Sequence, residues 1–269
     1  MLSTFRQIVL ANWQWRSQTW RLAITEIQKQ VRGAVLGWIW LLITPAVYVG
    51  VFWFALAVGL RTNSPVEGVP YIFWLTAAIV PWFFMSDMIS GGSDVYHRYS
   101  YLVNRLRFPI PVISSFYVMA KFIIFLVTMV LVLVVMVVSG VAFSLYNLQF
   151  FLVAALMYLF WLTWSMWTSP LSALSKDFHN LLKALSTPFF WLSGILFDAT
   201  RLSSPVLRWI LAFNPVTFFA SSYRAALCEH YWIWDRPQQY GPFLAVFLVL
   251  LVLAVRTQRR LGTVVADVL

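Results

Sequence analysis

The chain has 269 residues, of which 61% are hydrophobic and only 10% are charged. Soluble domains carry about 25% charged residues, so this composition excludes an ordinary soluble protein. The net charge of +10 would suit a nucleic-acid-binding protein, but Lys and Arg also collect on the cytoplasmic side of membrane proteins. We adopt the second interpretation and expect no nucleic-acid partner. Cys228 is the only cysteine, which excludes an intrachain disulfide and a cysteine-rich metal site.

Residues 1–33 are predicted to form an amphipathic helix. Apolar side chains, among them Trp13 and Trp20, recur at helical spacing, and a polar stripe with Arg21 and Arg32 runs beside them. Such a helix suits the membrane interface, where it lies flat instead of crossing. The alternative is a soluble helix that packs against a partner protein.

Residues 34–269 are predicted to form an all-α integral membrane domain with six transmembrane helices. A helix needs about 20 apolar residues to cross the hydrocarbon layer. The fifth crossing has the weakest pattern, because Pro188 interrupts its short uncharged stretch, so we expect a bent helix there. The uncharged runs cover residues 33–60, 68–86, 122–175 and 237–255, and they place the crossings at about 34–60, 70–90, 115–140, 150–174, 180–198 and 241–256.

The distribution of Lys and Arg predicts the topology. With the N-terminus inside, 13 of the 19 basic residues fall on the cytoplasmic side and 5 on the other, while Lys121 lies within a crossing. This bias predicts a multi-pass protein of the cytoplasmic (inner) membrane with both termini in the cytoplasm. The cytoplasmic parts then include a loop at 91–109 and a tail at 257–269.

Two charged residues fall close to one another in this topology. Asp87 ends the second crossing and Lys121 lies in the third, both toward the cytoplasmic side. They can pair, since charges within a membrane usually find partners. The alternative, which we favour, is that the long side chain of Lys121 extends to the membrane surface.

The segment from 198 to 242 is external in this topology, yet much of it is apolar. The stretches 206–213 and 216–227 are each predicted to be a short helix, and Asn214-Pro215 separates them. Both are too short to cross the membrane. We therefore expect a re-entrant or interfacial helical hairpin at about 200–228, before the last crossing.

The motifs of nucleotide hydrolysis and metal catalysis are missing from the sequence. There is no G-x-x-x-x-G-K-[ST] phosphate loop and no H-E-x-x-H pair, the three histidines lie in separate loops, and the nine acids are scattered. We therefore predict that the chain is not an enzyme and that it holds no catalytic residue, no metal and no cofactor of its own.

Aromatic residues make up 18% of the chain, and many fall in the middle of predicted crossings. Aromatic faces are broad, rigid and apolar, so a lining of them would let a sugar chain slide past without strong polar traps. The alternative is that these side chains fill helix–helix and lipid contacts. The predicted path residues are Trp38, Tyr48, Phe52, Phe84, Phe160, Trp164, Trp167, Phe189, Phe190 and Trp191.

Four stretches, in order, carry a resemblance to a known family. They are Leu36-Gly37-Trp38-Ile39-Trp40 with Pro45, the run Ile79-Val80-Pro81-Trp82-Phe83-Phe84 within 71–87, Asn104 with Arg107-Phe108-Pro109, and Asn214-Pro215 with Arg224. Together they resemble the permease subunits of ABC type-2 exporters for lipid-linked polysaccharides, which serve O-antigen, capsule and teichoic-acid export. One departure is Pro111, which lies earlier than the family pattern would place a proline.

The resemblance implies a role for each region. The loop after the second crossing would be a coupling helix that docks on a separate nucleotide-binding ATPase subunit, which binds ATP and Mg²⁺. Two copies of the chain would surround one path for a lipid-linked glycan within the membrane lipid. The implied coupling residues are Asp94, Tyr96, His97, Arg98, Tyr99, Leu102, Asn104 and Arg105, and the implied external gate residues are Arg208, Asn214, Pro215 and Arg224.

Two other functions remain open from the sequence. An ABC type-2 permease for a drug or a small lipid would share the same architecture. A membrane-embedded transferase that acts on lipid-linked sugars is the alternative from another class. It would need acids or histidines that converge near a membrane face.

Overall fold

The computed structural model describes residues 2–59, 64–66, 68–102 and 108–268. Nearly all of these residues are helical, and the isolated bridge between Val66 and Val69 is the only β pairing among them. The predicted all-α membrane fold is confirmed. Asn104, Arg105 and Arg107 of the predicted coupling loop, and Arg61 of the topology count, lie outside the described residues.

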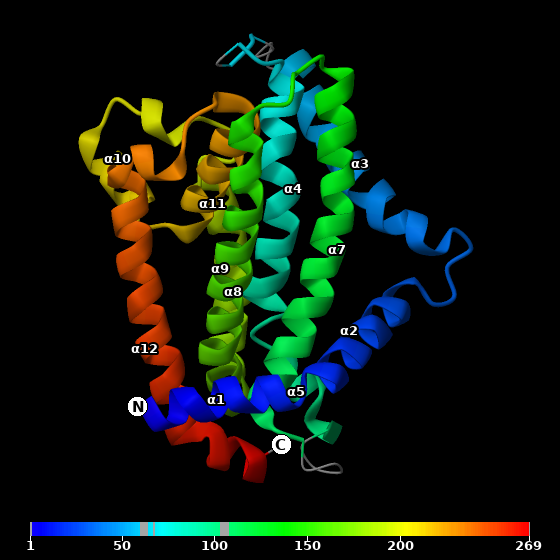
Figure 1. The fold of residues 1–269 in the computed structure, drawn as a ribbon, viewed down its shortest axis with the longest axis vertical. Helices are drawn as coiled ribbons and strands as arrows, with labels where there is room; N and C mark the ends of the chain where they lie inside the picture. Colours follow the sequence, from blue (N-terminus) through cyan, green and yellow to red (C-terminus); the bar gives the residue numbers. More distant parts are fainter. Residues whose placement is uncertain (1, 60–63, 67, 103–107, 269) are drawn as a thin grey trace.

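The N-terminal segment forms two helices where the sequence predicted one. Helix α1 (Leu2–Gln14) and helix α2 (Arg16–Val31) meet at Trp15, and both lie across one end of the molecule (Figure 1). The Trp15 ring packs edge-on against Phe108 at 4.8 Å, while Trp13 stays exposed. The segment is thus amphipathic and does not run through the bundle, and its place in the membrane interface stays a prediction.

Among the described residues, five helical segments are long and apolar enough to cross a membrane. The first combines a short 3-10 turn, α3 (Trp40–Trp53) and a π-helical turn at Phe54–Gly59. The others are α4 (Tyr71–Ser90), α7 (Ile110–Val138), α8 (Gln149–Leu174) with the preceding turn η3 (Leu145–Leu148), and α12 (Pro237–Val268), whose apolar part ends at Leu261. These correspond to five of the six predicted crossings.

The predicted fifth crossing, 180–198, is shorter and lies earlier in the chain than expected. Helix α9 (Lys176–Trp191) begins where the Ser175 hydroxyl accepts the backbone N–H of Phe178. Its 16 residues span about 24 Å, against about 30 Å of hydrocarbon. The chain then turns at Gly194, where φ is +72° and an added Cβ would lie 2.8 Å from the Cβ of Ala199. Since the turn requires glycine, the helix cannot continue to residue 198.

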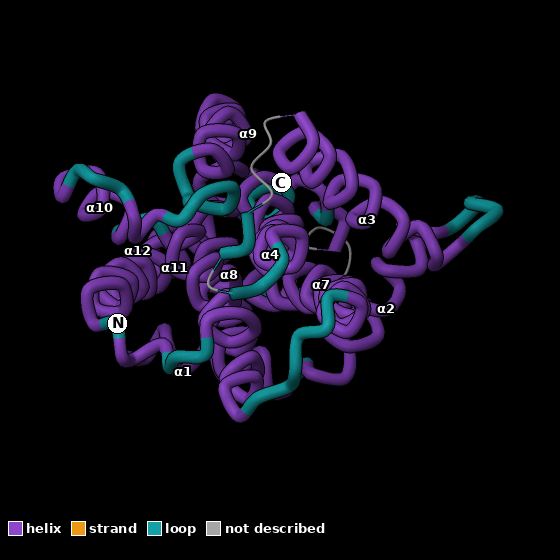
Figure 2. The backbone as a smooth tube through the Cα atoms, turned by 90° about the horizontal axis from the view of Figure 1, so that it is seen from above, coloured by secondary structure: helices purple, strands orange, loops and turns teal. Residues whose placement is uncertain are grey.

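Helix α4 is the centre of the bundle. In its most apolar stretch 78% of the residues are buried within the chain, against 17% for the span 37–59 that contains α3. Figure 2 shows α4 and α8 in the middle, with α3 at one edge and α10 (Pro205–Ala212) at the opposite edge. The inner helices therefore form the core, and α3 leaves most of its surface for contacts outside the chain.

The two ends of the bundle carry different structures. The N- and C-termini lie at the same end as the short helix α5 (Val95–Arg98) (Figure 1). Helices α10 and α11 (Pro215–Arg224) lie toward the other end. The charge bias predicts that the end with the termini is cytoplasmic, and we use "cytoplasmic" and "external" in that sense below.

Candidate functional site at the two ends of the bundle

A tight glycine corner joins α4 to α5. A Cβ on Gly92 would lie 2.6 Å from the backbone carbonyl oxygen of Met88, so only glycine fits there, and a Cβ on Gly91 would overlap the hydroxyl of Tyr117. The carbonyl of Gly92 accepts hydrogen bonds from the hydroxyls of Ser165 (2.6 Å) and Ser169 (2.9 Å) on α8. Two donors on one carbonyl fix the corner against the fourth predicted crossing.

Side chains of α5 fasten it to two other helices. The Tyr96 hydroxyl accepts a hydrogen bond from Gln258 Nε2 of α12 at 2.8 Å, and the same nitrogen lies 2.8 Å from the Met166 carbonyl. Burial raises the pKa of Tyr96 to about 12, so this hydroxyl stays protonated. His97 Nε2 lies 3.2 Å from the carbonyl of Ser172 on α8 and must donate, since a carbonyl can only accept. The corner is thus tied to α8 and to α12.

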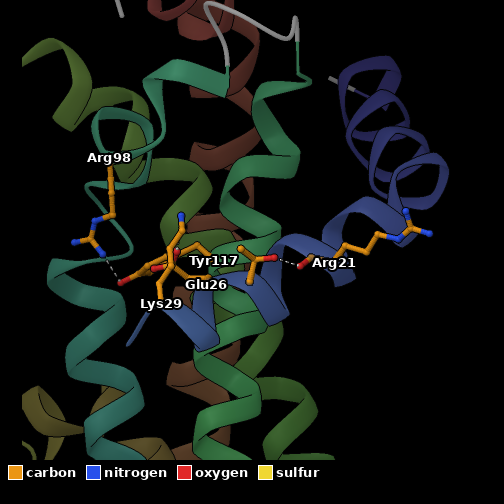
Figure 3. A network of polar contacts seen from close by, with 6 residues as sticks. Arg21, Glu26, Lys29, Arg98 and Tyr117 are labelled. Carbon is orange, nitrogen blue, oxygen red and sulfur yellow. Dashed lines mark hydrogen bonds and ion pairs between the residues drawn. The ribbon is translucent and has the colours of Figure 1, made fainter. Parts of the chain in front are cut away.

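The N-terminal helices reach the same corner. Arg98 donates to the Tyr117 hydroxyl of α7 at 3.3 Å, and Figure 3 shows this contact with Glu26 and Lys29 of α2 on the same side. The Lys29 ammonium lies 3.7 Å from the Glu26 carboxylate and 5.7 Å from the centre of the Tyr99 ring. Burial, and then the adjacent Glu26 carboxylate, raise the pKa of Tyr99 above its usual value. The corner therefore contacts α2 as well as α7.

The structure divides the predicted coupling residues into two groups. Tyr96, Tyr99 and Leu102 are buried, whereas His97 and Arg98 are exposed. Asp94 immediately precedes α5, and a second helical stretch starts at Ser100. Tyr101, which the sequence did not single out as a docking residue, is 45% exposed. Among the described residues of this loop, the exposed side chains are therefore His97, Arg98 and Tyr101.

Asp87 and Lys121 form an ion pair. Lys121 Nζ lies 2.8 Å from Asp87 Oδ2, and the Lys121 side chain is only 14% exposed against 50% for Asp87. The favoured interpretation, in which Lys121 extends alone to the membrane surface, is therefore wrong. The pair joins α4 to α7 near the corner. Asp87 lies in the last turn of α4, where its carboxylate reaches the ammonium group of Lys121 on α7.

The external hairpin begins each helix with a side-chain cap followed by proline. Asn214 Oδ1 accepts the backbone N–H of Val216 at 2.9 Å, and Pro215 is the first residue of α11. The Ser204 hydroxyl caps α10 in the same way, accepting the N–H of Leu207 at 3.4 Å, ahead of Pro205. These caps satisfy backbone donors that would otherwise be unpaired at the helix ends. Two short helices therefore form where the sequence predicted them, at slightly different bounds.

Arg224 joins the end of α11 to α4 and to the turn after α9. It is 3% exposed, and its guanidinium donates to the carbonyls of Trp74 (3.2 Å), Gly194 (2.7 Å) and Ile195. The same group stacks on the Trp74 ring at 3.2 Å, and Trp74 Nε1 donates to Glu229 at 3.3 Å. Arg224, predicted as a gate residue, is thus a buried cross-link between α11, α4 and the turn after α9, and its gate role stays a prediction.

Helix α10 borders open grooves on two sides. On one side a cavity of about 620 Å³ is lined by Arg208, Trp209 and the start of α12. On the other side, toward α9, a cavity of about 580 Å³ has an almost entirely apolar lining with Asn214 at its edge. Its other lining residues are Leu185, Pro188, Phe189, Leu192, Phe197, Leu202, Leu207, Ile210, Leu211 and Phe213.

The predicted path aromatics do not share one surface. Phe84, Phe160 and Phe190 are buried in the core of the single chain, so in this conformation they offer no face to a substrate. Phe52, Trp164, Trp167 and Phe189 are partly buried. Trp38, Tyr48 and Trp191 are exposed. Phe84, Phe160 and Phe190 therefore pack between helices in this conformation, as the alternative interpretation expects. The assignment of the aromatic residues to the path stays a prediction.

Several residues that build these sites gave no signal in the sequence. Ser165 and Ser169 lie in an otherwise apolar crossing, where a small hydroxyl residue is unremarkable. Tyr117, Gln258 and Trp74 act through partners far away in the chain, and only the fold brings them together. Within the described residues no group of three or more His, Cys, Asp and Glu side chains is placed to hold a metal ion.

The fold is that of an all-α membrane protein with five helical segments long enough to span a membrane among the described residues. The chain belongs to the ABC-2 type transporter family, whose profile matches residues 17–228. It is also similar to the O-antigen export system permease protein RfbA of Myxococcus xanthus. The two are 23% identical over 225 residues, covering 83% of this chain and 85% of that protein. Permeases of this family are transport components, so the resemblance found in the sequence motifs is confirmed.

Proposed function

We propose that this chain is the permease of an ATP-driven exporter that moves a lipid-linked polysaccharide from the cytoplasm to the outer face of the inner membrane. A separate nucleotide-binding subunit would bind ATP and Mg²⁺ and supply the energy. The substrate class is supported by the O-antigen export relative, with which the chain aligns over most of its length.

The observation that carries the transport mechanism is the fixed α4–α5 corner. His97, Arg98 and Tyr101 present an exposed surface on a backbone that hydrogen bonds tie to α8 and α12. A partner that pushes on this surface would move helices, because the corner has little freedom to yield by itself. Docking of the ATPase at this surface is therefore our proposal for energy coupling.

We further propose that two copies pair around the path. Phe52 of α3 contacts Phe190 of α9 at 5.4 Å, and the two helices lie on one side of the bundle (Figure 2). Tyr48 and Trp191 of these helices are exposed, and most of the span that contains α3 is not buried within the chain. A second copy in the membrane would cover part of this surface and leave the exposed aromatics along the path.

Co-purification tests the coupling proposal. The C-terminally tagged permease is extracted in mild detergent, and the proteins that accompany it are identified by mass spectrometry. We expect a stoichiometric partner with a phosphate-loop motif. Combined Arg98→Glu and Tyr101→Ala substitutions should remove it, because they change the exposed surface and leave the Tyr96 and Gly92 contacts in place.

The matched control is Arg259→Glu, which makes the same charge change at an exposed position of α12. It should retain the partner. Loss of the partner in the control alone, or retention in the double variant, would place docking elsewhere. If the wild-type chain is stable alone and no ATPase accompanies it, the exporter proposal fails and the transferase alternative returns.

A permease for a drug or a small lipid is the second candidate. The apolar cavity of about 580 Å³ between α9 and α10 favours it, since small-molecule sites are concave and mostly apolar, with few polar groups. Deletion of the gene separates the two functions. Loss of surface polysaccharide supports the glycan exporter, whereas unchanged polysaccharide with altered drug sensitivity or lipid composition supports the second candidate.

A further inference from the structure

Two parallel tryptophan rings and one tilted tyrosine ring contact one another in a row at the external end, outside the residues considered so far. The Trp232 and Trp234 rings are nearly parallel, at 6° and 5.0 Å between centres. Tyr146, from the connection between α7 and α8, lies 5.2 Å from Trp232. Trp234 is 53% exposed, so the stack ends in an open aromatic face. We call these three residues the aromatic shelf.

Hydrogen bonds hold the backbone beneath the shelf. The Asp235 carboxylate accepts the N–H of Trp232 at 3.0 Å. Gln149, at the start of α8, uses both ends of its amide. Its Nε2 donates to the carbonyl of Tyr231 (2.7 Å), and its Oε1 accepts the N–H of Ile233 (3.0 Å). The two connections that carry the shelf are thereby fixed to each other, and a rigid surface loses little conformational freedom when a ligand binds.

The exposed polar groups beside the shelf are an imidazole and a carboxylate. His230 is exposed and shares a hydrogen bond with the Ser144 hydroxyl at 3.0 Å, and Asp235 presents an exposed carboxylate. The nearby guanidinium of Arg236 is already stacked on the Tyr231 ring at 3.9 Å. An anionic phosphate would meet the Asp235 carboxylate here. A neutral polyhydroxylated ligand would find acceptors for its hydroxyls.

The second exposed aromatic pair at this end is different. Trp209 and Phe213 of α10 lie 5.6 Å apart, and the exposed Arg208 stands beside them. Trp with a neighbouring cation is typical of a membrane interface with phosphate headgroups. The contrast in charge therefore favours lipid at α10 and a sugar at the shelf.

We propose that the aromatic shelf is a glycan-binding site, which stacks the apolar faces of neutral pyranose rings on Trp234 and its neighbours while His230 and Asp235 bond to sugar hydroxyls. This rests on the proposed function, since it takes the external end to be where the glycan emerges. The shelf adjoins the hairpin, because Asn147 Nδ2 donates to the Ala226 carbonyl at 2.8 Å, just past the end of α11. A sugar chain leaving beside α11 would meet the shelf next.

A binding measurement tests the site. The full chain is placed in nanodiscs of phosphatidylethanolamine and phosphatidylglycerol. The probe is the surface polysaccharide of the source organism, released from its lipid by mild acid. Trp234→Ala should weaken binding about ten-fold, on the scale of a lost aromatic stacking contact together with its buried area, and Trp234→Phe should keep most of it. The matched control is Phe143→Ala, since Phe143 is 67% exposed in the same α7–α8 connection and has no aromatic stacking partner among the described residues.

The outcomes separate the site from the function. Equal binding by wild type and Trp234→Ala, or no binding by wild type, overturns the shelf proposal. Equal loss of thermal stability in Trp234→Ala and Phe143→Ala, with unchanged glycan binding, would identify the shelf as part of a lipid-facing aromatic belt and also overturn it. If a gene deletion removes surface polysaccharide while the shelf does not bind, the proposed function stands without the site. If the deletion leaves the polysaccharide unchanged, the proposed function itself fails.

Discussion

The two ends of this permease are built in opposite ways. At the cytoplasmic end, α5 has only four residues, yet hydrogen bonds fix its corner to α8, α7 and α12. At the external end, α10 is twice as long but borders open grooves on two sides, and Leu211 is its only buried side chain. In many proteins the elements that move are those with few buried contacts, because such elements have low local stability. In our proposal, the rigid cytoplasmic end receives force from the ATPase and the loosely packed external end opens.

Arg224→Met should have the largest effect and would test how firmly α11, unlike α10, is held. The change leaves three backbone carbonyls at Trp74, Gly194 and Ile195 without their donor. Loss of a buried charged donor costs roughly 3–5 kcal/mol, so we expect a much lower thermal midpoint in detergent, measured by fluorescence-detected size exclusion.

Arg224→Lys is the control for charge, since it keeps the cation but not the planar fork that reaches several carbonyls. It should fall between the wild type and Arg224→Met. A melting curve for Arg224→Met equal to that of the wild type would mean that the guanidinium is not a cross-link.

Gly92→Ala should have the next largest effect. It tests whether the α4–α5 corner must be rigid, in contrast to the loosely packed α10. The added Cβ would press on the Met88 backbone and shift the corner, at a cost of about 1–3 kcal/mol. We expect the permease to fold but to lose its coupling to the ATPase subunit. The measurement is the ATPase activity of the reconstituted complex, which should fall.

Gly241→Ala provides the control, because nothing lies within 4 Å of a Cβ built at that position in α12. It should leave both folding and ATPase activity unchanged. Full activity of Gly92→Ala would show that the corner tolerates movement and that its rigidity is unrelated to coupling.

Tyr96→Phe sharpens the same comparison by removing a single hydroxyl. Gln258 loses one acceptor but keeps the Met166 carbonyl, so the loss should be about 1 kcal/mol, visible as a small decrease in thermal midpoint. A Gln258→Leu variant and the double variant complete a cycle. Strict additivity of the two single effects would contradict a direct contact.

Ser204→Ala should have the smallest effect and tests the open side. The cap at the N-terminus of α10 is long, at 3.4 Å, and exposed, so its removal should cost about 0.5–1 kcal/mol locally. Because α10 is loosely packed, we expect an unchanged global midpoint but faster labelling of a cysteine placed at Leu207. Cooperative unfolding of the whole chain would show that α10 is part of the core.

Much of the fold was accessible from the sequence, for identifiable physical reasons. Long uncharged runs have few structural alternatives in a membrane, so the spans that contain α3, α4, α7, α8 and α12 were predicted close to their observed bounds. The fifth crossing was misplaced because its end depends on Gly194, whose left-handed backbone is invisible in hydropathy. Asn214-Pro215 was a reliable signal, since cap and proline act locally.

The sites were less accessible, because their contacts are distant in the chain. Arg224 was selected by its motif, but its partners Trp74 and Gly194 lie far away in the sequence, and so its buried position could not be inferred. The pairing of Lys121 with Asp87 could not be established from the sequence, since the sequence alone does not place α4 beside α7. The buried positions of Phe84 and Phe160 could not be inferred, because composition does not distinguish the lining of a path from a core.

The bond between Tyr96 and Gln258 has a consequence for the order of assembly. The two residues are 162 positions apart, and Gln258 follows the other spans in the chain. During synthesis the α4–α5 corner therefore lacks its support from α12 until that helix has been made and inserted. If the ATPase docks at this corner as we propose, a subunit that met the nascent chain earlier would find the corner incomplete, and the bond would delay its recruitment until the permease has inserted its last described helix.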